Sequence, residues 1–187
     1  QIVWIITSII VMFLIMLVDY NMLVKTSPVL YIISLVLLVL VLFTEPINGA
    51  TSWFSIGDFA FQPSEFAKIA VILFLAFSMS KLQERGKEEI NKPWKLLVTL
   101  LIVAVPLILI LIQPDYGTAA AYILALAFML FTAGISKKYI IAIVLLITIL
   151  APIFYMYVLP AHAKTRIEIF LNPESDPRGA GYNVIQS

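Results

Sequence analysis

Two polar segments in this sequence have the residue types to bind a charged group or transfer a proton. The first is Gln62-Pro63-Ser64-Glu65, followed by Lys68. Proline suits the first turn of a helix and glutamate suits its positive end, so the segment predicts a helix start. Glu65 and Lys68 lie three residues apart and can pair on one face. An anion site formed by the free N–H groups and the lysine is the alternative.

The second segment is Gln113-Pro114-Asp115-Tyr116-Gly117-Thr118, a chain reversal in few residues. Proline and glycine are typical turn residues, so we expect Pro114 and Gly117 to form this turn. Asp115 stands where its carboxylate can cap the helix that follows. Capping is favoured here over catalysis, which stays an alternative role.

A charged tail follows residue 160. Its ionisable residues are His162, Lys164, Arg166, Glu168, Glu174, Asp176 and Arg178. The apolar patch at residues 167–171 predicts a short amphipathic helix lying on the membrane, ended by Asn172-Pro173. Asp176-Pro177 and the glycines after them predict a turn whose acid points back toward the helices. For His162, Lys164 and Glu168, composition favours a solvated loop.

Residues 49–58 are too polar to cross a bilayer and too apolar for a solvated loop. Trp53 is of the type that gathers at the headgroup region, so we expect this segment at the membrane interface. A plain aromatic anchor explains Trp53 equally well.

The composition indicates a membrane protein. The 187 residues are 62% hydrophobic and 12% charged, far from the globular norm, which excludes a water-soluble monomer. A net charge of +1 argues against binding nucleic acid through bulk phosphate attraction. The absence of cysteine and the single histidine exclude thiolate and multi-histidine metal sites within this chain.

The elements that must position these residues are six apolar stretches, each long enough for a membrane helix. They cover residues 2–18, 28–43, 64–80, 96–112, 118–135 and 139–159. We therefore expect an all-α polytopic membrane bundle forming one domain, with helices through residue 159 and an outer loop beginning at 160. The first stretch has no charged leader or cleavage site, which favours a chain cut from a longer protein.

The distribution of Lys and Arg predicts the orientation, because cytoplasmic loops carry the excess of positive charge. Eight lie on one side of the six crossings: Lys25, Lys81, Arg85, Lys87, Lys92, Lys95, Lys137 and Lys138. Four lie on the other: Lys68, Lys164, Arg166 and Arg178. The side with eight is expected to be cytoplasmic, where its loops look like simple anchors. The functional segments then face outward together.

Four ordered motifs resemble the SEDS family of shape, elongation, division and sporulation proteins, which includes RodA, FtsW and SpoVE. They are Gly49-Ala50 with Trp53 and Gly57; Gln62-Pro63-Ser64-Glu65 with Lys68; Gln113-Pro114-Asp115 with Gly117-Thr118-Ala119; and Arg166 with Phe170-Leu171-Asn172-Pro173, Asp176-Pro177, Gly181-Tyr182 and Gln186-Ser187. The tail looks most like the RodA branch. One departure is Ser52, where the family usually has arginine, so no phosphate contact of that arginine is carried over.

The resemblance implies a partial chain, because the family has about ten membrane helices and residues 160–187 look like the start of its large outer loop. It implies a glycosyltransferase that polymerises lipid II on the outer face of the bacterial cytoplasmic membrane during cell elongation. The implied partners are a class B penicillin-binding protein and other elongation or division proteins. The family's catalytic aspartate falls on Asp176.

The polymerisation of lipid II implies roles for the remaining site residues. A base must take a proton from a sugar hydroxyl, and cations must neutralise the departing pyrophosphate. Asp176 would be the base, and Lys68, Arg166 and Arg178 would supply positive charge. Trp53, Glu65 and Asp115 complete the expected substrate-binding set, with Glu65 and Lys68 shaping the cavity. A divalent cation, Mg²⁺ or Mn²⁺, is plausible, although the sequence displays no ligand set.

Two other functions stay open. One is a transporter that flips the lipid-linked precursor, which predicts ionisable residues near the middle of helices. Asp19, Glu65, Lys68 and Asp115 all stand near predicted helix ends, which favours the enzyme. The other is a scaffold without catalysis, because apolar helices serve assembly equally well.

Overall fold

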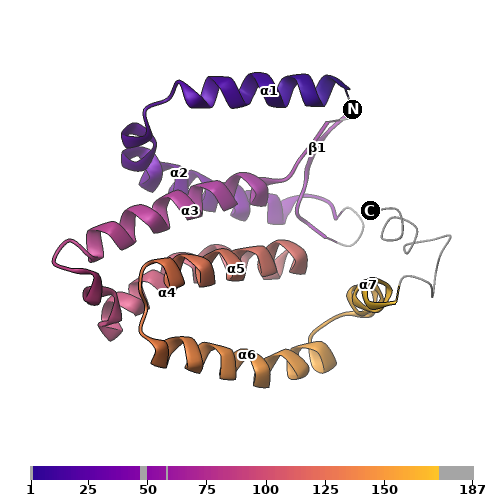
Figure 1. Ribbon diagram of the computed structural model, residues 1–187. Coiled ribbons are helices and arrows are strands. Elements are labelled where there is room, and N and C mark those ends of the chain that lie inside the picture. Colours follow the sequence, from indigo (N-terminus) through magenta and orange to yellow (C-terminus); the bar gives the residue numbers. More distant parts are fainter. Residues whose placement is uncertain (1, 47–49, 58, 173–187) are drawn as a thin grey trace. The chain divides into compact units, whose positions relative to one another are not determined.

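The computed structural model describes residues 2–46, 50–57 and 59–172, and all six predicted stretches are helical in it (Figure 1). The helices are α1 (Ile2–Met16), α2 (Tyr20–Leu40), α3 (Pro63–Leu82), α4 (Pro93–Ile112), α5 (Tyr116–Thr132) and α6 (Lys137–Tyr157). This confirms the predicted polytopic, helical membrane fold.

Within the described residues, three helical segments are long and apolar enough to cross a bilayer by length and composition: Tyr20–Phe43, Pro93–Ile112 and Lys137–Val158. The first of these joins α2 to a short 3₁₀ helix, η1 (Val41–Phe43). α1 and α5 are shorter apolar helices. α3 is as long as α4 but carries Glu65 in its first turn and Lys81 in its last.

Contacts divide the chain into two units, Gln1–Ile135 and Ser136–Ser187. The core of the first unit lies among α2, α3, α4 and α5, which pack side by side (Figure 1). Its fully buried side chains include Leu38, Leu75, Val103 and Ile110. The organisation of the chain as one domain stays a prediction.

α2 begins eight residues before the predicted start at Pro28. Proline has no N–H to donate to the carbonyl four residues earlier, so it usually marks a helix start. Here the freed carbonyl of Val24 accepts a 2.6 Å hydrogen bond from the hydroxyl of Ser27, and the helix continues through Pro28. Asp19 caps the true start by accepting from the N–H of Asn21. Lys25 therefore lies in a helix, where a loop was expected.

Between α2 and α3 the chain forms a hairpin that the sequence analysis did not predict. β1 (Phe54–Ile56) pairs antiparallel with β2 (Phe59–Phe61), with Ser55 opposite Ala60. Gly57 has a φ of 62°, which glycine adopts without strain. The Gly-Asp pair between two apolar runs is a known hairpin signal. Part of the segment expected at the membrane interface is therefore a two-stranded sheet.

The linker from α3 to α4 is ordered by polar contacts and contains the 3₁₀ helix η2 (Lys87–Asn91). The ammonium group of Lys95 donates to the carbonyl of Leu82 and to Glu89, and Glu89 also pairs with Lys92. Gln83 donates to the carbonyl of Ala133 at the end of α5. We name Gln83, Glu89, Lys92 and Lys95 the linker clamp. Lys95 is only 8% exposed, so this linker is more than the simple anchor expected.

The second unit contains α6 and α7 (Ala161–Leu171). α7 begins six residues before the predicted patch at 167–171 and ends before Asn172, as predicted. Lys164 donates to the carbonyl of Met156, and Tyr155 donates to Glu168 at 3.3 Å. The solvated loop favoured for His162, Lys164 and Glu168 is therefore wrong, because all three lie in a helix. Lys164 and Glu168 in particular bond to the end of α6.

Candidate functional site

The start of α3 has the predicted local structure. Pro63 occupies the first helical position, where its missing N–H costs nothing, and Glu65 lies in the first turn. The ammonium group of Lys68 lies 2.9 Å from Glu65, as predicted. The Lys68 side chain is 29% exposed and that of Glu65 is 58% exposed. This pair therefore lies at an accessible edge of the helix start.

The turn before α5 is built differently from the prediction. Asp115 caps α5 as expected, because its Oδ1 accepts from the N–H of Thr118 at 3.1 Å. Gly117, however, lies inside α5, and the prediction that it forms the turn is wrong. Pro114 has the positive φ, 29°, and the N–H of Asp115 reaches back to the carbonyl of Ile110. This bond ends α4, and α5 follows after a short turn.

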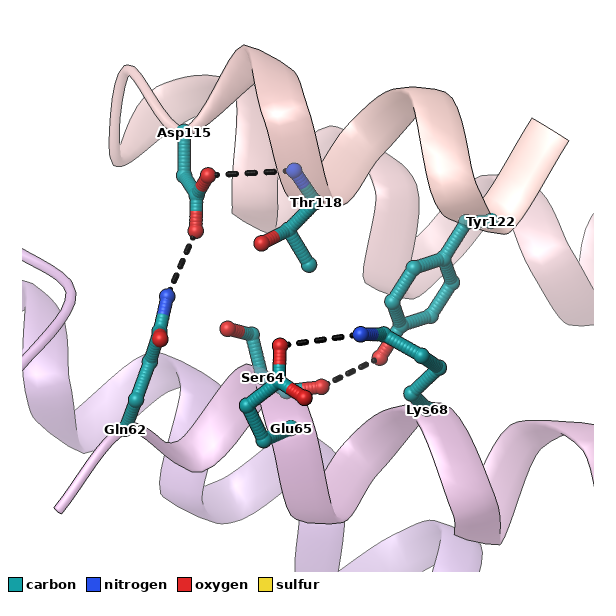
Figure 2. Close-up of polar contacts among 7 residues, drawn as sticks. All are labelled: Gln62, Ser64, Glu65, Lys68, Asp115, Thr118 and Tyr122. Carbon is teal, nitrogen blue, oxygen red and sulfur yellow. Dashed lines mark hydrogen bonds and ion pairs between the residues drawn. The ribbon is translucent and has the colours of Figure 1, made fainter. Parts of the chain in front are cut away.

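The starts of α3 and α5 are joined by two hydrogen bonds (Figure 2). The side-chain amide of Gln62, just before α3, donates to Oδ2 of Asp115 at 2.8 Å. The hydroxyl of Tyr122, in the second turn of α5, donates to the carbonyl of Ser64 at 3.1 Å. We name this group the α3–α5 cluster: Gln62, Ser64, Glu65, Lys68, Asp115, Thr118 and Tyr122. It brings three of the predicted site residues together, namely Glu65, Lys68 and Asp115.

Two buried oxygens at this end of the helices have no hydrogen-bond partner in the described part of the chain, Ser64 Oγ and Gln113 Oε1. Both residues are fully buried. The amide nitrogen of Gln113 is used, since it donates to the carbonyl of Leu38 in the last turn of α2. Buried polar atoms are normally paired. The cluster and its surroundings therefore keep hydrogen-bonding capacity that the fold does not use.

The other predicted site residues are Trp53, Arg166, Asp176 and Arg178. Trp53 is half-buried just before β1, and its carbonyl accepts from the hydroxyl of Thr44 at 3.2 Å. Arg166 lies in α7, in the second unit, and its side chain is outside the described part. Asp176 and Arg178 lie outside the described residues.

Ser52, where the resemblance leads us to expect arginine, is buried, at 2% exposure. An arginine there would have to place a charged side chain where the short serine now fits.

Sequence reasoning missed Gln62, Ser64, Thr118 and Tyr122 as members of the site. The sequence did indicate that Tyr122 needs a partner, since a tyrosine within an apolar helix must find one for its hydroxyl. Gln62 had none, because its side chain does not cap its own helix and reaches across to another one.

The whole chain matches one protein family. A model of the FtsW/RodA/SpoVE family, described as cell cycle protein, matches residues 1–187. The chain belongs to the FtsW/RodA/SpoVE family. Membership confirms the resemblance found in the motifs, and with the apolar helices it identifies a multi-pass membrane protein.

Several members of the FtsW/RodA/SpoVE family are similar to this chain. The peptidoglycan glycosyltransferase MrdB of Escherichia coli K12 is 36% identical over 168 residues, which cover 86% of this chain and 42% of MrdB. A probable peptidoglycan glycosyltransferase FtsW of Trichlorobacter lovleyi is also 36% identical, over 91% of this chain and 44% of that protein.

One solved structure has the same fold over most of the chain. It is a chain of a peptidoglycan synthase complex, studied for how polymerization and crosslinking are coordinated. The TM-score is 0.73 at 31% identity, over 93% of this chain and 50% of that one. The present chain thus spans about half the length of these family members.

Proposed function

We propose that the full-length protein is a peptidoglycan glycosyltransferase that polymerises lipid II on the outer face of the cytoplasmic membrane. The family match over residues 1–187 carries this proposal, together with relatives that are named peptidoglycan glycosyltransferases. The RodA-like tail favours a role in cell elongation and shape. The excess of Lys and Arg at the opposite helix ends supports the outward orientation.

In the proposed reaction, Asp176 removes the proton from a hydroxyl of the acceptor sugar. The hydroxyl oxygen attacks the anomeric carbon of the donor sugar, and the bond from that carbon to the undecaprenyl pyrophosphate breaks. The pyrophosphate leaves with the electron pair and is already ionised, so it needs charge neutralisation and no general acid. One carboxylate base and nearby cations are therefore sufficient.

The α3–α5 cluster would take part in binding the substrate. Lys68 is the cation of the cluster, and Arg166 and Arg178 would add positive charge from the tail. Glu65 holds the Lys68 ammonium group at 2.9 Å, which fixes its position in the absence of substrate. Asp115 has both carboxylate oxygens engaged, which suits a positioning role better than proton transfer. Trp53 would contact the substrate from the hairpin side.

A divalent cation at the pyrophosphate stays a prediction. In the described part of the chain no three His, Cys, Asp or Glu side chains gather closely enough to hold a metal ion. Polymerisation with and without a chelator, followed by Mg²⁺ or Mn²⁺ addition, tests the need for one.

The proposed partner is a class B penicillin-binding protein that crosslinks the new glycan. The peptidoglycan synthase complex with the same fold supports this pairing. Co-purification of the full-length protein with its partner, for wild type and for Asp176→Ala, tests whether assembly and polymerisation are separate properties.

The deciding experiment is glycan synthesis from lipid II by the purified full-length protein with its partner. We expect Asp176→Ala to lower polymerisation at least a hundredfold, as for loss of a general base, without loss of partner binding. Asp19→Asn is the matched control, because asparagine also caps a helix and Asp19 lies at the far end of α2 from the hairpin. Normal synthesis by Asp176→Ala would remove this residue from the mechanism.

A transporter of the lipid-linked precursor is the alternative. Transport predicts ionisable groups near the middle of helices. In the described helices α1 to α6, every Asp, Glu, Lys and Arg lies in the first two turns or the last turn. Flipping of lipid II by the protein in proteoliposomes, without glycan formation, would favour transport over synthesis.

A further inference from the structure

The two hydrogen bonds between the starts of α3 and α5 run in opposite directions. Gln62, at the start of α3, donates to Asp115, which caps α5. Tyr122, within α5, donates to the carbonyl of Ser64 in α3. One such bond would allow either helix to rotate about it. Two bonds at different heights fix both the spacing and the rotation of the helix starts.

Burial makes these bonds sensitive to replacement. Tyr122 is 2% exposed and Ser64 is fully buried, so a lost partner cannot be replaced by bulk water. Gln62 is half-buried and donates to a carboxyl oxygen of Asp115 at 2.8 Å. Neither side chain is needed for the helices to form, since both helices have apolar packing of their own.

These two hydrogen bonds hold the start of α3, which is the part of the helix that carries the Glu65–Lys68 pair. Ser64 immediately precedes Glu65 and lies one helical turn before Lys68 (Figure 2). A rotation of this first turn would swing the Glu65–Lys68 pair around the helix axis. Tyr122 therefore determines which way the Lys68 ammonium group faces, although it does not bond to Lys68.

We propose that Gln62 and Tyr122 are positioning residues that hold the Glu65–Lys68 pair in register with Asp115. The inference rests on the proposed function only where it concerns substrate binding. Its structural half is that Tyr122 fixes the first turn of α3. This half does not depend on which reaction the protein catalyses.

The test uses the full-length protein in lipid nanodiscs with Tyr122→Phe and Gln62→Leu. Tyr20→Phe is the control, because it deletes the same hydroxyl from a side chain that is 67% exposed. In hydrogen exchange, Tyr122→Phe should speed amide exchange of residues 64–68 about fivefold, with residues 75–82 unchanged. Unchanged exchange at residues 64–68 would overturn the proposal.

Steady-state polymerisation of lipid II provides the second readout. Tyr122→Phe should raise KM more than it lowers kcat, because it misplaces a binding group and leaves the base intact. In a Lys68→Met background the same substitution should have almost no further effect on KM, since the ammonium group that Tyr122 positions is absent. A KM effect of equal size in both backgrounds would overturn the positioning role. If the wild-type protein makes no glycan, the proposed function fails, and hydrogen exchange still decides the structural half.

Discussion

The hydroxyl of Tyr31 in α2 donates a 2.8 Å hydrogen bond to the carbonyl of Ile102 in α4. This carbonyl is the one that a residue at position 106 would bond in a regular helix, but Pro106 has no N–H. A freed carbonyl in the bilayer core has no water to bond. Tyr31 therefore supplies, from a neighbouring helix, the donor that α4 lacks, and this allows a proline in its interior.

Tyr31→Phe should destabilise the full-length protein by about 1 kcal/mol, the usual net value of one hydrogen bond. The ring still packs against Phe74, 4.7 Å away between centroids, so only the hydroxyl is lost. Unfolding in mixed micelles measures the change. In a Pro106→Ala background the alanine N–H bonds Ile102, and the cost of Tyr31→Phe should fall below half. An equal cost in both backgrounds would contradict this explanation.

Asp115→Ala should cost about 2 kcal/mol, because it removes the cap of α5 and the partner of Gln62 together. Asp115→Asn should cost less than half of that, since asparagine caps helices well and its NH2 group can donate to Gln62 once the Gln62 amide turns its oxygen toward it. Thermal unfolding of the three full-length proteins gives the comparison. Equal losses for alanine and asparagine would mean that charge, rather than hydrogen bonding, is what matters at this position.

The sequence predicts the helices well and their connections poorly, for a physical reason. Apolar length identifies these stretches, and all six are helical, while three helical segments of the described chain meet the length and composition of a membrane span. Six crossings stay a prediction. Ser27 bonds the carbonyl freed by Pro28 from within the same helix, and Tyr31 bonds the carbonyl freed by Pro106 from a neighbouring helix. Proline statistics contain neither compensation. These two bonds move the start of α2 and keep α4 continuous.

The candidate site was predictable where it depends on neighbours in the chain. Glu65–Lys68 pairing and capping by Asp115 follow from spacings of three residues, and both are present. The bonds from Gln62 and Tyr122 span more than fifty positions, so no local pattern indicates them. Asp176 lies outside the described residues, and its role stays a prediction.

The linker clamp should make stability depend on pH through Glu89. Hydrogen bonds from Lys92 and Lys95 lower the pKa of this carboxyl from 4.5 to about 2. A lowered pKa means that the ionised form stabilises the fold. This contribution is complete above pH 4.5, the value for the unfolded chain, and is lost as the pH falls toward 2.

Thermal unfolding of wild type and Glu89→Gln across this range tests the prediction. The difference in melting temperature should be constant above pH 4.5 and should shrink steadily on acidification. Glu45→Gln is the control, because Glu45 makes no ion pair among the described residues. A difference that stays constant down to pH 2 would contradict the role of Glu89.

The two lysines that share Glu89 should differ in importance although their distances are equal. Lys92 and Lys95 both lie 2.7 Å from Glu89, but their side chains are 54% and 10% exposed. An exposed pair is screened by water and contributes little. Lys95 also bonds the carbonyl of Leu82 at the negative end of α3, so its loss removes two hydrogen bonds made by a largely buried side chain. We expect Lys95→Met to cost about 2 kcal/mol and Lys92→Met less than about 0.5 kcal/mol in chemical unfolding of the full-length protein. Equal costs would mean that burial does not decide the strength of this clamp.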